Sequence, residues 1–324
     1  MKKLGCLVAA LMALLIAGWL VIGSVMGEAT IEEDTVFAIP AGSSLTAVAN
    51  RMEEQGLISS ADGFLLNAKL FGGGDAIQAG EFELTADMSQ ADILGAFQNG
   101  DVIRRFITIP EGMPSIMVFE RLMAHELLSG EIEIPPEGSV LPDTYDFERG
   151  EARSAVLARM QSAMTDYLDQ AWEERSADAA VTSKAEAVIL ASIIEKETGN
   201  AQERFDVASV FVNRLRKGIR LQTDPTVIYG ITQGQGTLGR GLRRSELDRE
   251  TPWNTYRIDG LPPTPIANPG RAAIEAALNP ASTEYIYFVA KTLDPADGHN
   301  FAVTLDEHNR NVAAYRRLEA QRDN

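Results

Sequence analysis

Near its N-terminus the chain carries an uncharged apolar run, and this feature limits most strongly what the chain can fold into. The run extends over residues 4–27 and follows Lys2 and Lys3. About 20 helical residues, at about 1.5 Å each, cross the roughly 30 Å hydrocarbon layer of a bilayer. Because positive flanks stay in the cytoplasm, the rest of the chain is expected outside it. We therefore predict a single-pass anchor at 1–27 in the cytoplasmic (inner) membrane and a periplasmic or other extracytoplasmic body.

A cleaved signal peptide is the main alternative for this run. Signal peptides contain an apolar region of about 7 to 15 residues and a cleavage site of small residues. The run in this chain is longer, and residues 23–27 contain no clear A-x-A site. These differences favour the anchor.

The composition argues against nucleic acid as a partner and against a metal site. The chain has 46 acidic residues and 29 Lys plus Arg, a formal net charge of −17, whereas nucleic-acid binding depends on cations that neutralise phosphates. The single cysteine, Cys6, lies in the apolar run, so no cysteine-based zinc site or internal disulfide can form. The three histidines, His125, His299 and His308, are scattered without tight metal-ligand spacing. We expect neither a nucleic-acid partner nor a bound metal.

After the apolar run we expect an acidic spacer at 28–34 and a small α+β module at 35–105. Ser43 or Ser44 is placed to cap the first helix of this module. Modules of this size are common in binding domains, although a spacer that holds the next domain away from the bilayer is an equal alternative. The expected elements are strands at 36–39 and 79–84 and helices at 47–55 and 90–97.

The remaining residues, 106–324, are expected to form a mostly helical domain with short strands. Residues 106–112 repeat the strand-and-turn pattern of the preceding module. The overall fold class is therefore α+β. The expected helices cover 116–125, 152–174, 183–198 and 206–217.

The most distinctive segment is the helical stretch at 189–198, which contains Glu195 and Glu197. Glu195 shares a helix face with the small residues Ala191 and Ser192, which leaves room for a ligand. Glu197 falls on the apolar side and could be a partly buried acid with a raised pKa. Helical spacing does not choose between them, and a solvated or capping charge is the structural alternative for either.

Two later segments are rich in polar and aromatic groups. Residues 220–230 form a polar stretch in which Asp224 precedes Pro225, a pattern as typical of a helix start as of a ligand contact. Residues 252–256 and 260–263 combine rigid turns, aromatics and an amide. Such a combination suits a carbohydrate groove and equally suits a packed loop.

These segments together resemble the YceG-like (MltG) family of endolytic murein transglycosylases. The resemblance covers most of residues 104–315 in order, and the stretch at 221–230 is highly specific. It implies a LysM-like module at 35–105 and a lytic-transglycosylase-like catalytic domain at 106–324. The glycine-rich connection within 230–251 is weakly matched and receives no role. The other segments that carry the resemblance are 191–198, 207–215, Tyr256, 260–263, 269–270, 287–289 and His308 with Asn309.

The resemblance implies cleavage of the β-1,4 bond between N-acetylmuramic acid and N-acetylglucosamine within glycan strands. It implies 1,6-anhydromuramoyl ends, a role in cell-wall assembly through strand termination, and no metal or organic cofactor. It assigns the catalytic acid to Glu195, with Glu197 as the second candidate. Expected partners are peptidoglycan strands, the bilayer through 4–27 and cell-wall synthesis proteins. The candidate substrate-binding residues are Asn213, Gln222, Thr223, Asp224, Asn254 and Tyr256.

Two alternatives remain open at this stage. A hydrolytic muramidase would use Asp224 or Glu197 to position water, because glycoside hydrolysis usually needs two carboxylates. A non-catalytic peptidoglycan-binding scaffold would act through residues 35–105 and leave Glu195 structural.

Overall fold

The computed structural model describes residue 12 and residues 29–72 and 74–322. The predicted anchor at 1–27 therefore lies almost wholly outside the described residues. Within the described ranges, no helix has the length and apolar character needed to cross a membrane. The chain divides into two compact units. One comprises Met1–Arg105 and Asp146–Gly150, and the other comprises Phe106–Tyr145 and Glu151–Asn324.

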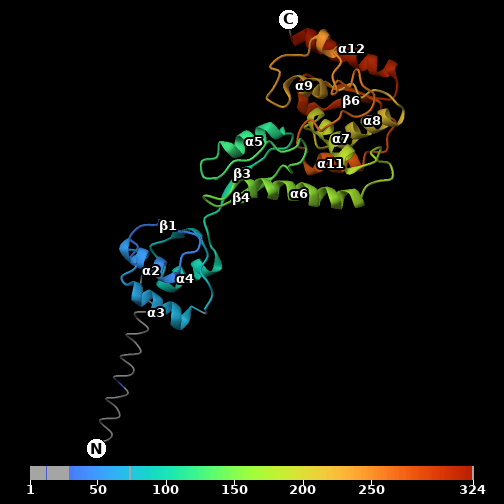
Figure 1. Cartoon of the computed structure of the whole chain (residues 1–324). Coiled ribbons are helices and arrows are strands. Elements are labelled where there is room, and N and C mark those ends of the chain that lie inside the picture. Colours follow the sequence, from blue (N-terminus) through green and yellow to red (C-terminus); the bar gives the residue numbers. More distant parts are fainter. Residues whose placement is uncertain (1–11, 13–28, 73, 323–324) are drawn as a thin grey trace, which may run out of the picture. The chain divides into compact units, whose positions relative to one another are not determined.

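The amino-terminal unit is a small α+β fold built on two antiparallel strands, β1 (Thr35–Ile39) and β2 (Gly80–Leu84). Phe37 and Phe82 face each other across the strands. Serine side chains accept backbone N–H bonds at the start of each helix, as is typical of helix caps. The helices are α2 (Leu45–Glu54), α3 (Ala61–Phe71) and α4 (Gln90–Asn99), coloured blue to cyan in Figure 1.

The core of this unit is aromatic. The Phe97 ring lies 4.8 Å from that of Phe82 and 5.9 Å from that of Phe37, measured between centroids. Ala29 and Ile31 are also buried in this core, although sequence analysis assigned them to an acidic spacer. An apolar side chain gains free energy by leaving water, so these two residues pack although acidic residues follow them.

The carboxyl-terminal unit is mostly helical, and its hydrophobic core surrounds α7 (Lys184–Glu197). Every residue of α7 from Ala187 to Ile194 is buried, and the helix packs against α6, α8, α9 and α11. Ser183 caps its first turn, as the sequence predicted for a helix beginning near this residue. The other helices are α5 (Ser115–Met123), α6 (Arg153–Glu173), α8 (Arg204–Arg216), α9 (Asp224–Thr232), α10 (Arg244–Leu247), α11 (Arg271–Leu278) and α12 (Leu305–Arg322).

Short strands complete the molecule. Strand β3 (Arg105–Thr108) pairs with β4 (Thr144–Phe147). Strand β5 (Tyr287–Ala290) pairs antiparallel with β6 (His299–Ala302), a 3-10 turn (Pro295–Asp297) lies between them, and α12 packs on this hairpin. A helix-rich chain with a few short strands confirms the predicted α+β class.

Candidate active site

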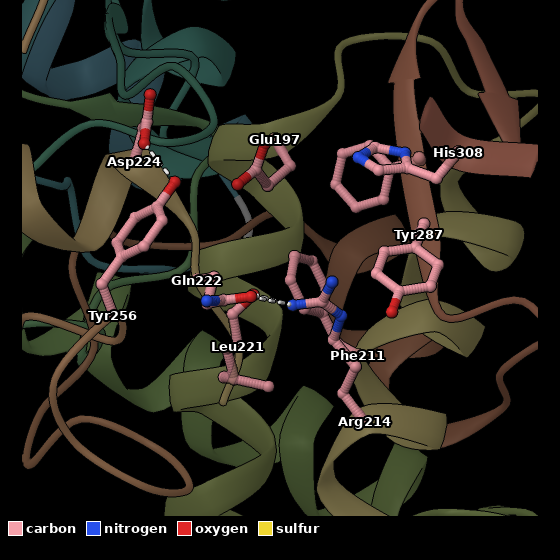
Figure 2. A pocket seen from close by; sticks show the side chains of 10 residues that line it. Glu197, Phe211, Arg214, Leu221, Gln222, Asp224, Tyr256, Tyr287 and His308 are labelled. Atoms are coloured by element: carbon pink, nitrogen blue, oxygen red, sulfur yellow. Dashed lines mark hydrogen bonds between the residues drawn. The ribbon is translucent and has the colours of Figure 1, made fainter. Parts of the chain in front are cut away.

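A cavity of about 380 Å³ opens where the end of α7 meets α8, the start of α9, β5 and α12. In the view of Figure 2, Glu197 lies between the Asp224–Tyr256 pair and the Tyr287–His308 pair. We call this cavity the Glu197 pocket. Its lining residues are Glu197, Phe211, Arg214, Leu221, Gln222, Asp224, Tyr256, Tyr287, Phe288 and His308.

Hydrogen bonds hold the end of α7 in place, and this fixes the position of Glu197. The helix stops after Glu197 because Thr198 adopts an extended backbone. The Thr198 hydroxyl donates to the buried carboxylate of Glu203 at 2.7 Å. Glu203 in turn accepts from the backbone N–H of His299 at 2.8 Å and lies 2.7 Å from the His299 ring nitrogen Nδ1. Thr198, the residue that follows α7, is thus tied through Glu203 to β6.

The carboxyl group of Glu197 has a strongly perturbed proton affinity. Burial raises its pKa to about 7, and the nearby negative charge of Asp224 acts in the same direction. The Thr223 hydroxyl donates a hydrogen bond to this carboxylate and opposes the shift. Near neutral pH a large fraction of such a group is protonated, so Glu197 can donate a proton and afterwards accept one.

Arg214 joins the walls of the pocket. Burial lowers the pKa of its guanidinium. Its Nε donates to the carbonyl of Ile286 at 2.6 Å, and its Nη1 donates to the carbonyls of Arg220 and Leu221 at 2.9 and 3.1 Å. The same Nη1 lies 3.2 Å from Oε1 of Gln222. Arg214 therefore holds α8, the loop before α9 and the segment leading to β5 together.

The loop before α9 is strained where it meets the pocket. Gln222 adopts a φ of 53°, in the left-handed region that costs free energy for a residue other than glycine. Its backbone N–H donates to the carbonyl of Thr255 at 3.2 Å. Two residues later, Asp224 opens α9 and accepts from the Tyr256 hydroxyl at 2.7 Å. The strained turn aims Gln222 and Asp224 at the same cavity.

The opposite wall comes from β5 and α12. The rings of Tyr287 and His308 stack with centroids 4.9 Å apart and an angle of 19° between their planes. Burial and the charge of Arg214 lower the pKa of His308, which favours the neutral imidazole. Phe288 packs edge-on against Phe211. An aromatic wall beside an acid is a suitable surface for a sugar ring.

The candidate substrate-binding residues predicted from the sequence fall into three groups. Gln222, Asp224 and Tyr256 line the pocket with Glu197. Thr223 is buried behind Glu197 and acts on it through its hydroxyl.

Asn213 and Asn254 form the third group, because the protein uses their side chains internally. The Asn213 amide donates to the carbonyls of Thr283 and Tyr285 at 2.8 and 3.0 Å. Asn254 is fully buried, and its amide donates to carbonyls in the 246–249 turn, the shortest of these bonds being 2.6 Å to Arg249. Neither residue lines the Glu197 pocket.

Glu195, the first candidate for the acid, lies on another face of α7. Two residues along a helix turn the side chain by about 200°. The Glu195 carboxylate accepts from the backbone N–H of Gly270 at 3.0 Å, at the start of α11. Burial and the charge of Glu111 raise its pKa. Glu195 does not line the Glu197 pocket.

Six residues that line the Glu197 pocket were not predicted from the sequence. Arg214, Tyr287, Phe288 and His308 lie in segments that carried the family resemblance, yet nothing in their spacing connects them. The tertiary fold alone brings α8, β5 and α12 together. The unselected residues are Phe211, Arg214, Leu221, Tyr287, Phe288 and His308.

Comparison with known proteins defines the class to which this fold and site belong. The YceG-like family matches residues 37–314, and the chain belongs to this family. A solved structure of a YceG-like protein from Listeria monocytogenes is 29% identical, with a TM-score of 0.51. That match covers 86% of this chain and 99% of the other.

Two curated relatives carry the same name, endolytic murein transglycosylase. The one from Bacillus subtilis is 29% identical over 310 residues, which cover 86% of this chain and 83% of the relative. The one from Streptococcus pneumoniae serotype 2 is 26% identical over 338 residues. That alignment covers 89% of this chain but 59% of the pneumococcal relative, so this chain spans less than two thirds of its length.

Proposed function

We propose that this chain is an endolytic lytic transglycosylase that acts on peptidoglycan. Membership of the YceG-like family and the shared name of the curated relatives support this activity. The observation that carries the proposal is the acid in the pocket, because burial raises the pKa of Glu197 to about 7. A general acid works best when its pKa lies near the working pH.

In the proposed reaction, Glu197 serves first as an acid and then as a base. Its proton passes to the glycosidic oxygen between N-acetylmuramic acid and N-acetylglucosamine as the bond to the muramoyl C1 breaks. The resulting carboxylate then takes the proton of the muramoyl C6 hydroxyl, and the C6 oxygen bonds to C1. The products are a free N-acetylglucosamine hydroxyl and a 1,6-anhydromuramoyl end, and no water is consumed. One carboxylate suffices because the nucleophile belongs to the sugar.

Glu197 is a better candidate for this role than Glu195, to which the family resemblance first assigned it. The Glu197 carboxyl lines a cavity with open volume, whereas the Glu195 carboxylate accepts a backbone hydrogen bond at the start of α11. An acid must reach the oxygen that it protonates. We therefore assign the acid two residues further along α7, with Glu195 as a structural group.

The other lining residues have roles consistent with this reaction. Glycoside cleavage passes through an oxocarbenium-like state with positive charge near C1. The exposed carboxylate of Asp224, oriented by Tyr256, can stabilise that charge electrostatically. Gln222 offers an amide to the acetamido group of a sugar.

The cellular setting follows from the substrate. Peptidoglycan lies outside the cytoplasm, so the proposed activity requires an extracytoplasmic body. The anchor at 4–27, attachment to the inner membrane and contact with cell-wall synthesis proteins remain predictions. We also propose that the amino-terminal unit is the LysM-like module, and its small α+β fold supports this assignment.

Hydrolysis is the second candidate function, because Asp224 places another carboxylate in the same cavity. Product chemistry separates the two reactions. The purified full-length chain is incubated with uncrosslinked glycan strands in ¹⁸O-labelled water, and the new ends are analysed by mass spectrometry. A transglycosylase yields unlabelled anhydro ends that are one water lighter. Reducing ends that carry ¹⁸O would refute the proposal in favour of a muramidase.

A further inference from the structure

A second cavity, of about 360 Å³, is lined by two residues that are sequence neighbours of residues lining the Glu197 pocket. Lys196 lines this cavity beside Glu197 in the sequence, and Pro225 lines it beside Asp224. Its outer wall is the glycine-rich loop at 234–240, which sequence analysis left without a role. We call it the glycine-loop cavity. The two cavities therefore lie along the same two segments, the end of α7 and the start of α9.

Most of the wall of the glycine-loop cavity is apolar. Pro114, Ile228, Tyr229, Leu238 and Ile266 contribute carbon surface to it. A polysaccharide backbone needs many hydrogen-bond partners, because a hydroxyl that loses water without a partner costs free energy. The wall is better suited to small aliphatic groups.

The loop is shaped so that it can pass close to the rest of the wall. Gly234 adopts a φ of 76°, which side-chain-bearing residues rarely adopt. A Cβ atom at this position would lie 2.6 Å from the Cβ of Pro114. Glycine at this position therefore allows the loop to pass close to Pro114 at the start of α5.

Lys196 is the positive charge that is open to a ligand in this cavity. It is exposed, and its Nζ makes a long hydrogen bond of 3.4 Å to the carbonyl of Gly112. Among the residues that the structure describes, no carboxylate lies within ion-pair distance of it. The other cation at the wall, Arg240, is already paired with both carboxylate oxygens of Glu246. A carboxylate entering the cavity would therefore be paired by Lys196.

We propose that the glycine-loop cavity binds the peptide stem of the muramoyl residue next to the scissile bond. This inference rests on the proposed function. In a glycan strand of alternating sugars, the stem is attached to the muramoyl lactyl group alone, and it carries small aliphatic side chains and free carboxylates. The apolar wall accepts the aliphatic groups, and Lys196 accepts a carboxylate. The enzyme then prefers stem-bearing strands to bare glycan.

The test compares two substrates that differ only in the stem. Uncrosslinked strands are divided, and an amidase removes the stems from one half. We expect the full-length chain to cut the stem-bearing strands with a kcat/KM at least about tenfold higher, since a paired charge and several aliphatic contacts are gained. Equal cutting of both substrates, or faster cutting of the bare glycan, overturns this inference but leaves the proposed function standing. No cutting of either overturns the proposed function and this inference with it.

Two variants show whether the preference arises in this cavity. Lys196→Met should reduce the ratio of the two kcat/KM values by about two- to fivefold, the range expected for one exposed ion pair. Leu238→Glu, which places a negative charge in the wall, should reduce it by roughly tenfold. Lys217→Met is the matched control, because it removes an exposed positive charge at the end of α8, outside both cavities. Thermal unfolding confirms that each variant is folded, and an unchanged ratio in both folded cavity variants overturns the inference.

Discussion

The last turn of α7 carries two glutamates whose side chains lie in different surroundings. Glu197 faces a cavity, and burial raises the pKa of its carboxyl to about 7. Glu195 accepts a backbone N–H bond at the start of α11, where a negative group is favoured by the helix dipole. One carboxyl lines open volume, and the other accepts a hydrogen bond that links α7 to the start of α11. Residue type and proximity therefore say little about catalysis until the partners of each carboxyl are known.

The largest effect expected from this difference is on catalysis. Glu197→Gln keeps the shape of the side chain but can neither donate the proton nor accept it, so kcat should fall by about 10² to 10⁴-fold. Glu195→Gln is the matched control and should retain most of the activity. Rates on uncrosslinked strands measure both. A larger loss in Glu195→Gln would return the acid to that position.

The second effect concerns stability and its dependence on pH. The folded-state pKa of Glu197 is about 7, against an ordinary value of 4.5. Between these values the folded chain binds more protons than the unfolded chain, so this carboxyl's contribution to the free energy of unfolding decreases as pH rises. The decrease amounts to about 3 kcal/mol by pH 8.

Urea denaturation at pH 5 and pH 8 measures this contribution. Glu197→Gln should lack it, so the variant should gain stability relative to the native chain between the two pH values. Glu195→Gln should change in the same direction, because burial and the charge of Glu111 raise the pKa of that carboxyl as well. A stability difference between Glu197→Gln and the native chain that is the same at both pH values would contradict the raised pKa.

The third effect is a loss of stability on the other face of α7. Glu195→Ala removes the acceptor for the Gly270 N–H at the start of α11, and such losses cost about 1 to 2 kcal/mol. The midpoint of urea denaturation should fall while kcat stays near the native value. A variant with unchanged stability and low kcat would mean that Glu195 is not the structural member of the pair.

The smallest expected effect is on the pKa of Glu197 itself. Thr223→Val removes the hydroxyl that donates to Glu197 and favours its charged form. The pKa of Glu197 should rise by about half a unit to one unit, which moves the alkaline limb of the kcat profile to higher pH. Thr226→Val is the matched control, because the Thr226 hydroxyl is equally buried but bonds to Thr223 and Thr255. A shift of the alkaline limb in Thr226→Val alone would contradict the role of the Thr223 hydroxyl in setting the pKa of Glu197.

Helices that end at a clear stop signal were predictable from the sequence. The expected helix at 183–198 is α7 (Lys184–Glu197), and that at 206–217 is α8 (Arg204–Arg216). Each ends two residues before a glycine, Gly199 or Gly218, and this stop signal is visible in a single sequence. By contrast, α12 has no fully buried residue, so its apolar spacing is weak and it was not predicted.

The site was only partly predictable, for a physical reason. Helical spacing separates the faces of Glu195 and Glu197, but it does not say which face meets the loop at 221–224. Asn254 shows the same limit, because an amide that binds a sugar and an amide that binds backbone carbonyls look alike in a sequence. Hydrogen bonds between distant segments decide such cases.

The order in which the pocket is assembled has a consequence for the growing chain. Glu197 and Asp224 are synthesised well before Tyr287 and His308, which form the facing wall. Domains generally fold as units, and folding can begin while the chain is still emerging. A nascent chain that ends before β5 holds the acid but lacks the wall that receives a sugar ring. Under the proposed function, the pocket is therefore complete only once the chain has been synthesised past residue 308.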